Sequence, residues 1–118
     1  MKKRSTTLTL SLRRPWFDLI KSGVKLEEYR EMKECWYKRL CRETNPNCPW
    51  LNPMRSIHFE IRKDFDTLVF TLGYPRKDDV TRRLVFKNPK IRIGTGKPEW
   101  GAQPGKTYFI ITWENNNG

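Results

Sequence analysis

Two cationic residues and one anionic residue lie close together in the sequence, just after a glycine. Lys25, Glu28 and Arg30 follow Gly23 in the stretch Gly-Val-Lys-Leu-Glu-Glu-Tyr-Arg. In an extended strand Glu28 and Arg30 share a face, while Lys25 lies at the turn and can converge with them. A lysine beside a carboxylate and a guanidinium can hold an anion or move a proton, and its pKa falls if it is desolvated. The alternative is a structural ion pair that ties a strand to a helix.

The residues around Gly23 predict the elements that position this trio. Leucines alternate with polar residues from Thr7 to Leu12, which predicts a half-buried strand. A short helix is predicted from Pro15 to Ser22, with the proline in the first turn and Gly23 as the C-cap. Lys25 to Arg30 is then predicted as a second strand.

The rest of the chain predicts one more helix and several strands. Met32, Trp36 and Leu40 recur every four residues, so we expect an amphipathic helix from Met32 to Cys41. Prolines predict an ordered, inserted loop at 44–56. From Ile57 onward the patterns are all strand-like, at 57–61, 68–72, 84–86, 91–93 and 107–113, with a break at Asn88-Pro89.

This order of elements predicts an α+β fold that is mainly β. Two short helices followed by strands and turns favour a small β-barrel flanked by two or more short helices. We expect one domain over residues 7–113, a basic tail at 1–6 and a polar tail at 114–118. No run of apolar residues is long enough to span a membrane, so no membrane partner is predicted.

The composition favours a polyanionic partner. Lysine and arginine number 24 against 13 aspartates and glutamates, which gives a net charge of +11. Such a field attracts nucleic acids, although it can also serve solubility alone. The three cysteines are an odd number and argue against a secreted disulfide framework. We therefore expect a cytoplasmic protein, with a monomer as the default.

A second basic cluster lies at 76–97, a segment that contains eight lysines and arginines but only two aspartates. Lys90 and Arg92 share a strand face by parity. A cationic strand face beside a cleft would contact phosphates without reading the base sequence. Arg13 and Arg14, at the end of the first predicted strand, can extend it. A solvated strand face is the alternative.

The tryptophans divide into two groups. Trp16, Trp36 and Trp113 lie on apolar stripes and are predicted to belong to the core. Trp100 follows Pro98-Glu99 in a predicted loop, where its ring can stack on a base. Packing into the end of a barrel is the alternative for that side chain.

No metal or cofactor is predicted. Cys35, Cys41, Cys48 and His58 could in principle supply a zinc site, but no Cys-x-x-Cys pair is present. His58-x-Glu60 lacks the downstream Pro-Cys-x-x-Cys of the zinc deaminases. His58 is also the only histidine, so a histidine-based hydrolase would depend on that one residue.

Several motifs together resemble the ASCH domain, a relative of the PUA domain, over nearly the whole chain from Leu8 to Trp113. They are Leu-Ser-Leu-Arg-Arg-Pro-Trp at 10–16, Leu19-Ile20, Gly23-x-Lys25-x-x-Glu28-x-Arg30, Gly73-Tyr74, Ile91 and Ile93, Pro-Glu-Trp-Gly-Ala at 98–102 and Gly105-Lys106-x-Tyr108-Phe-Ile-Ile. The resemblance implies a PUA-like β-barrel with a cleft between barrel and helices.

The resemblance also implies a ligand, which is RNA or a nucleotide-like molecule. Lys25, Glu28 and Arg30 would line the cleft, and a late loop with Glu99 and Trp100 would close over it. One branch of the family hydrolyses N4-acetylcytidine with a lysine, a threonine and a later glutamate. Other members are described as RNA-binding, and some as ribonucleases. Lys25 matches that lysine, but Glu28 stands at the threonine position and removes the hydroxyl.

The leading hypothesis is therefore a binding domain, with Arg13, Arg14, Lys90 and Arg92 holding phosphates. The rival hypothesis is a hydrolase that uses Lys25 with Glu28 or Glu99 as the proton partner. A regulatory domain that binds an acidic protein is a third option.

Overall fold

A computed structural model describes residues 6–43 and 59–114 of the chain. The expected loop at 44–56 and most of both tails lie outside these residues. No helix in the two described segments is long and apolar enough to cross a membrane. The elements in chain order are β1 (Thr7–Leu12), α1 (Arg14–Lys21), β2 (Glu28–Glu31), α2 (Glu34–Leu40), β3 (Cys41–Glu43), β4 (Phe59–Ile61), β5 (Thr67–Leu72), η1 (Val80–Arg82), β6 (Arg83–Thr95), η2 (Pro98–Trp100) and β7 (Thr107–Glu114).

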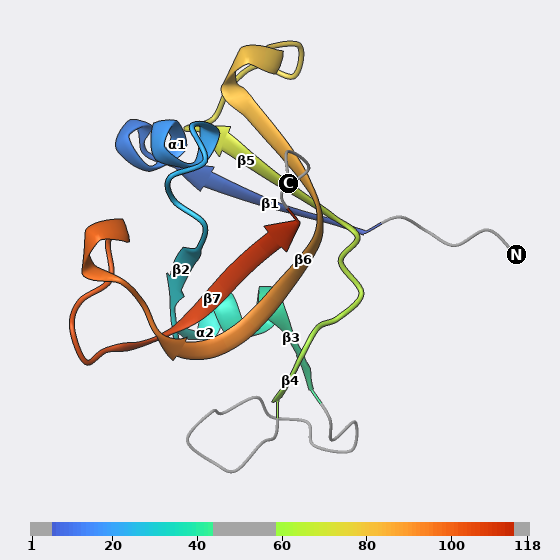
Figure 1. Cartoon of the computed structure of the whole chain (residues 1–118). Helices are drawn as coiled ribbons and strands as arrows, with labels where there is room; N and C mark the ends of the chain where they lie inside the picture. The colour runs from blue at the N-terminus through green and yellow to red at the C-terminus, as the bar shows by residue number, and fades with distance from the viewer. Residues whose placement is uncertain (1–5, 44–58, 115–118) are drawn as a thin grey trace, which may run out of the picture.

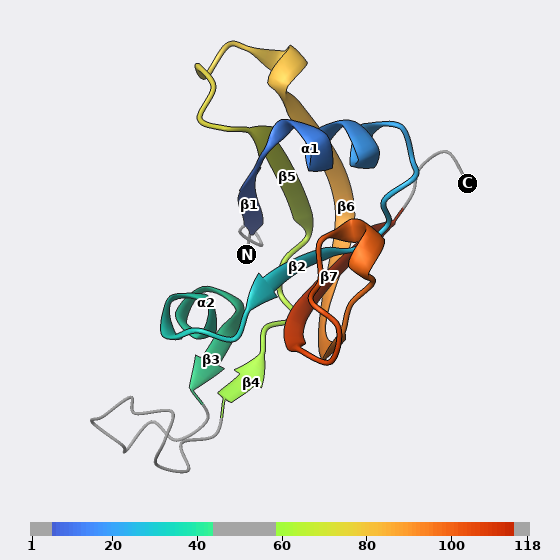
Figure 2. The ribbon, with the colours of Figure 1, turned by 90° about the vertical axis from the view of Figure 1, so that its left-hand side faces the viewer.

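The described elements form an α+β fold, mainly β, built on a mixed five-stranded sheet. The strand order is β1-β5-β6-β7-β2, with β1 parallel to β5 and the other neighbours antiparallel. A separate two-stranded sheet pairs β3 with β4. Figure 1 shows the long strand β6 bending from the side of β5 to the side of β7, so the large sheet is strongly curved. Helices α1 and α2 lie toward opposite ends of its open side, with β2 between them (Figure 2).

The sheet is not closed, so the expected barrel is not confirmed. Strands β1 and β2 are its two edges, and no backbone ladder joins them. Instead, two arginine side chains donate to carbonyl groups along the open edge of β1. Arg30 of β2 donates to the carbonyl of Ser11 at 2.9 Å, and Arg39 of α2 donates to that of Thr9 at 2.8 Å. Side chains thus satisfy edge carbonyls that a strand would pair in a closed barrel.

Trp36 holds these two arginines in place. Its ring lies 5.1 Å from the Arg30 guanidinium carbon and 4.8 Å from that of Arg39. Flat guanidinium groups stack well on aromatic faces, so the ring orients both donors toward β1. We call Arg30, Trp36 and Arg39 the arginine seam. It links β2 and α2 to the far edge of the sheet.

The main core lies on the inner face of the curved sheet. As predicted from alternation, Leu8, Leu10 and Leu12 of β1 are buried there, together with residues of α1, α2, β5 and β7. Strand β7 is buried on both faces, because Phe109 and Ile111 join this core while neighbouring residues join a second cluster. That second cluster comprises Tyr29, Ala102, Tyr108 and Ile110, with Trp100 packed against it.

Several elements differ from their predicted bounds. Helix α2 begins at Glu34 and ends at Leu40, and Cys41, which was expected in that helix, begins the unexpected strand β3. Strand β2 begins at Glu28, three residues later than expected, so Lys25 lies in the irregular connection after α1. The expected break at Asn88-Pro89 is a bulge within the continuous strand β6, where the register shifts between Lys87 and Lys90. Asn88 takes a left-handed φ of 52° there, which lets the strand bend and continue.

Candidate functional site

A cavity of about 500 Å³ opens to solvent where β1, α1, β2 and the loop before β7 meet. Its volume lies in the range of small-molecule sites, which is roughly 300–1,000 Å³. Polar and aromatic side chains make up most of its wall. The lining residues are Ser11, Leu12, Arg13, Trp16, Lys25, Glu28, Tyr29, Arg30, Glu31, Trp36, Trp100, Gly101, Gln103, Lys106 and Tyr108.

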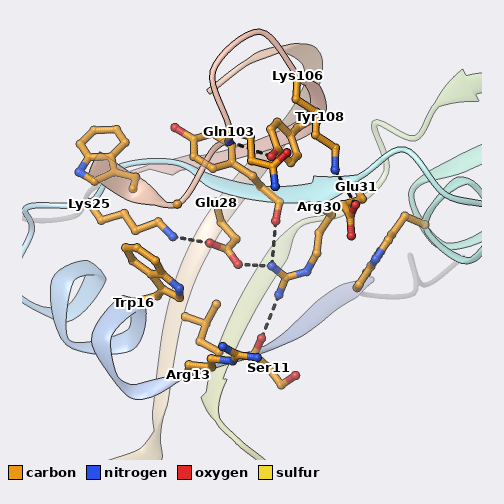
Figure 3. A pocket seen from close by; sticks show the side chains of 15 residues that line it. Ser11, Arg13, Trp16, Lys25, Glu28, Arg30, Glu31, Gln103, Lys106 and Tyr108 are labelled. Atoms are coloured by element: carbon orange, nitrogen blue, oxygen red, sulfur yellow. Dashed lines mark hydrogen bonds and ion pairs between the residues drawn. The ribbon is translucent and has the colours of Figure 1, made fainter. Parts of the chain in front are cut away.

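The predicted trio converges in this cavity (Figure 3). The Lys25 ammonium lies 2.5 Å from Glu28 Oε1, and the Arg30 guanidinium pairs with Glu28 Oε2. Arg30 also donates to the carbonyl of Tyr29 at 3.0 Å and to that of Ser11 at 2.9 Å. The Glu28 carboxylate therefore pairs with two cations. Through its hydrogen bonds to the backbone of β2 and β1, Arg30 connects this charge network to both edge strands of the sheet.

Two members of the trio are buried although they are charged, and Arg30 is partly buried. Lys25 is 1% exposed and Glu28 is 4% exposed. Glu28 and Arg30 lie opposite Ile111 and Phe109 of β7, so they share the inner face of the sheet, as their spacing predicts. A buried carboxylate without partners would cost several kcal/mol, and here both of its oxygens are paired.

Burial lowers the pKa of Lys25 below its usual value. Desolvation is the largest cause, and the charge of Arg30 adds to it. The carboxylate of Glu28 opposes the shift through its charge and its hydrogen bond. The ammonium also lies 4.5 Å from the ring centre of Trp16, which forms a cation–π contact. Trp16 therefore lies in the cavity wall, and the expectation that it belongs to the core is wrong.

The loop between β6 and β7 forms the opposite wall. The Tyr29 hydroxyl donates to Glu27 at 2.8 Å and accepts from the Lys97 amide at 3.0 Å, which anchors the start of η2. Burial, with help from Glu27, raises the pKa of Tyr29 to about 12. At the end of η2, Gly101 has a φ of 102° and passes so close to Trp16 that a Cβ atom would lie 3.1 Å from its ring. These contacts position Trp100 at the cavity.

The rim carries a second set of charges. Lys106 pairs with Glu31 at 2.7 Å, and Lys33 pairs with the same carboxylate at 3.0 Å. Lys106 and Lys33 together hold the pKa of Glu31 below its usual value. The Tyr108 hydroxyl accepts the amide of Gln103 at 2.9 Å, which fixes the turn before β7. The rim can thus present ammonium and amide groups to a ligand.

Of the other predicted site residues, some line the cavity and others lie outside it. Arg13 and Trp100 line the cavity, whereas Arg14 is exposed on α1, 3.9 Å from Asp18. Glu99 is exposed in η2 and is not among the lining residues. The structure therefore does not bring Glu99 to Lys25.

Lys90 and Arg92 also lie away from the trio. Arg92 is paired in register with Ile110, which shares its face with Tyr29 and not with Glu28. It binds Glu27 at 2.6 Å on that outer face. Lys90 lines a separate cavity of about 560 Å³ near the bulge of β6. The phosphate-binding role expected of both residues has no support from their positions relative to the cavity of the trio.

Sequence reasoning missed several lining residues. Lys106 and Tyr108 were noted only as part of a motif, and Gln103 carried no signal. The spacing Gly105-Lys106-x-Tyr108 places Lys106 and Tyr108 on one strand face, and this parity could have suggested a shared wall. Their place in the cavity wall depends on the pairing of β7 with β2, in which Tyr108 lies opposite Glu31.

Within residues 6–43 and 59–114, no group of three or more histidine, cysteine, aspartate or glutamate side chains could hold a metal ion. Cys35 is exposed, and Cys41 is buried in the core. In comparisons with protein-family models, curated proteins and solved structures, nothing matched this chain.

Proposed function

We propose that this chain is an ASCH domain that binds RNA or a nucleotide-like ligand in the cavity of the trio. Its PUA-like barrel would be incomplete, with the arginine seam bridging the gap between β1 and β2. The observation that carries the proposal is the charged trio, with Lys25 and Glu28 buried, at the floor of an open cavity with aromatic walls. A desolvated charge network of this kind is more costly than a packed apolar floor, which favours a role in binding.

The lining residues have the chemistry that such a ligand requires. Trp16 and Trp100 offer aromatic faces on which a base can stack. Arg13 and Lys106 offer cationic groups at the rim that can pair with phosphate oxygens. The trio below them can form hydrogen bonds with the edge of a base.

A titration with single-stranded RNA and with a nucleoside monophosphate tests this proposal. We expect Arg13→Ala and Lys106→Ala to weaken binding at least several-fold, since each removes a cation at the cavity. Lys38→Ala is the matched control, because Lys38 is exposed on α2 and pairs with Glu34 at 3.4 Å, away from the cavity. Equal affinities for all four proteins, or no binding at all, would rule the cavity out as the site.

A hydrolase is the second candidate, and the lowered pKa of Lys25 favours it. A lysine that is more easily deprotonated can act as a general base toward a water molecule. Hydrolysis of N4-acetylcytidine would break the amide bond and release acetate and cytidine. Glu28 is the partner in reach of Lys25, at 2.5 Å. Glu99 is not retained in this role.

Incubation with N4-acetylcytidine and with single-stranded RNA separates the two candidates. Release of acetate or of RNA fragments that stops in Lys25→Met would support the hydrolase. Measurable binding without turnover of either compound would leave the binding domain.

A further inference from the structure

The connection between β5 and β6 presents an aromatic ring to solvent. Tyr74 is 94% exposed, the largest value among the exposed large hydrophobic side chains of the described residues. Arg76 and Lys77 follow it closely and are exposed as well. An exposed ring next to two cations is the combination that binds single-stranded nucleic acids, by stacking on a base and pairing with phosphates.

Hydrogen bonds hold this connection in a defined shape. Gly73 takes a φ of 63° directly after β5, and its carbonyl accepts the Thr71 hydroxyl at 2.7 Å. Further along, Arg83 donates to the carbonyl of Arg76 at 2.6 Å and to that of Asp79 at 2.8 Å. Because the backbone is already ordered, a ligand that contacts Tyr74 loses little entropy in ordering the loop.

The same connection is joined to the cavity. Strands β1 and β5 are parallel, so they end side by side, and the Gly73 amide donates to the carbonyl of Leu12 at 3.1 Å. The next residue after Leu12 is Arg13, which lines the cavity. Figure 2 shows the connection leaving β5 beside the end of β1 and the start of α1. Arg13 and Tyr74 are thus the residues that directly follow Leu12 and Gly73, the two partners of this backbone hydrogen bond.

The cations along this path are available to a ligand. Arg13, Arg76 and Lys77 form no ion pair with another described residue, and Arg14 has only a weak, exposed pair with Asp18. The acidic residues that follow do not neutralise the path. Asp79 is occupied by Thr81 at 2.5 Å and by Arg82 at 3.3 Å, which leaves Asp78 as the exposed acid beside Lys77.

We infer that the ligand is a single strand of RNA longer than the cavity can hold. It leaves the cavity past Arg13, crosses the adjoining ends of β1 and β5, and stacks a base on Tyr74. This inference rests on the proposed function and adds the substrate class and the direction of the strand's path. A duplex does not fit this path, because its bases are stacked on one another and offer no free face to the ring.

Binding of oligouridylates of two and ten nucleotides tests the inference. We expect the wild-type protein to bind the ten-nucleotide strand more tightly than the dinucleotide. Tyr74→Ala should weaken binding of the longer strand by at least about fivefold, which is the lower limit for loss of one base-stacking contact. The same variant should bind the dinucleotide as the wild type does, and Tyr74→Phe should retain the affinity for both.

A charge-matched pair of variants tests the cations of the path. Arg76→Ala with Lys77→Ala should reduce the slope of log affinity against log salt for the longer strand by about 1.4, since each lost phosphate contact removes about 0.7. Lys38→Ala with Lys63→Ala removes the same charge from exposed positions away from the path and should leave the slope unchanged.

The outcomes separate this inference from the proposed function. Equal affinity for both strand lengths, with no effect of Tyr74→Ala while Arg13→Ala still weakens binding, overturns the path and leaves the cavity as a nucleotide site. Equal binding of a ten-base-pair RNA duplex also overturns the path. Failure of the protein to bind any of these RNAs while it still binds a nucleoside monophosphate overturns the path alone, and failure to bind either kind of ligand overturns both proposals.

Discussion

At the scale of single residues, Glu28 is the centre of the site. Its carboxylate is buried on the face of β2 that packs toward the core, and it survives there because Lys25 and Arg30 pair with its two oxygens. The energetic consequence is asymmetric. A complete buried pair adds little net stability, whereas removal of one member leaves an uncompensated charge in a poorly solvated place.

We therefore expect Glu28→Gln to lower the free energy of unfolding by about 3 kcal/mol or more, because the buried Lys25 and the partly buried Arg30 lose their anion. Urea unfolding measures this change. Glu34→Gln is the control, since Glu34 forms an exposed pair with Lys38 on α2, and it should cost less than about 0.5 kcal/mol. Similar effects of the two substitutions would contradict the burial argument.

Tyr29 should make stability depend on pH in the alkaline range. Its pKa is about 12 in the folded protein and near 10.0 without the fold, because burial disfavours the phenolate. The folded state thus holds the proton more tightly, so this contribution is complete below pH 10 and is lost as the pH rises toward 12. We expect a loss of about 1–2 kcal/mol over that range.

Urea unfolding of the wild type and of Tyr29→Phe between pH 9 and pH 12 checks this expectation. Lys25 is present in both proteins, so its own titration largely cancels in the comparison. Absorbance of phenolate at 295 nm should show one tyrosine fewer titrating near pH 12 in the variant. A wild-type protein that loses no more stability than the variant would contradict the assigned role of burial.

At the scale of elements, the loop between β6 and β7 depends on close packing against β2. A Cβ atom added to Gly96 would lie 2.6 Å from Cζ of Tyr29 and 2.8 Å from Cβ of Ala102. Such distances are shorter than van der Waals contact, so only glycine fits between these side chains. The position of the loop that carries Trp100 therefore depends on the small size of Gly96 as well as on the hydrogen bonds of Tyr29.

We expect Gly96→Ala to destabilise the protein by about 1–3 kcal/mol through overpacking, and to raise amide hydrogen exchange across 97–102. Gly105→Ala is the comparison, because a Cβ atom there would meet nothing within 4 Å and only the φ of 78° would be strained. It should cost about 1–2 kcal/mol and leave exchange at 97–102 unchanged. Equal exchange in both variants would show that the loop does not depend on Gly96.

At the scale of the whole molecule, the net charge of +11 acts over distances longer than any single contact. The cations of the cavity and of the β5–β6 connection are a small part of this charge, so a polyanion is attracted before it reaches either place. Long-range attraction raises the rate of encounter, whereas the contacts inside the cavity decide what remains bound.

We expect the affinity for a ten-nucleotide RNA to fall linearly on a log–log plot as salt rises from 50 to 300 mM, with a slope of about −0.7 for each phosphate contacted. Binding of an uncharged nucleoside in the cavity should change little over the same range. Fluorescence anisotropy for the RNA and calorimetry for the nucleoside give the two values. A salt-independent affinity for the RNA would rule out phosphate contacts.

Much of the local structure was predictable because it depends on residues near one another in the chain. Alternation in β1 and the proline and glycine around α1 mark elements that form as expected. The parity of Glu28 and Arg30 also correctly predicted their common face, since side chains two apart in a strand point the same way.

Other features depended on which strands pair and in what register. Alternation shows that Lys90 and Arg92 share a face, but only their pairing with β7 shows that it is the face opposite Glu28. The number of strands likewise suggested a closed barrel, whereas β1 and β2 remain separate edges joined by arginine side chains.

The amino-acid sequence alone thus determined the helices, most strands and the members of the charged trio, because short-range periodicity and turn chemistry decide them. Only the tertiary structure decided that Lys25 lies buried over Trp16, that Lys106 and Tyr108 line the same cavity as Arg30, and that Glu99 does not. These relations arise from contacts between segments far apart in the chain, which no local pattern of residues encodes.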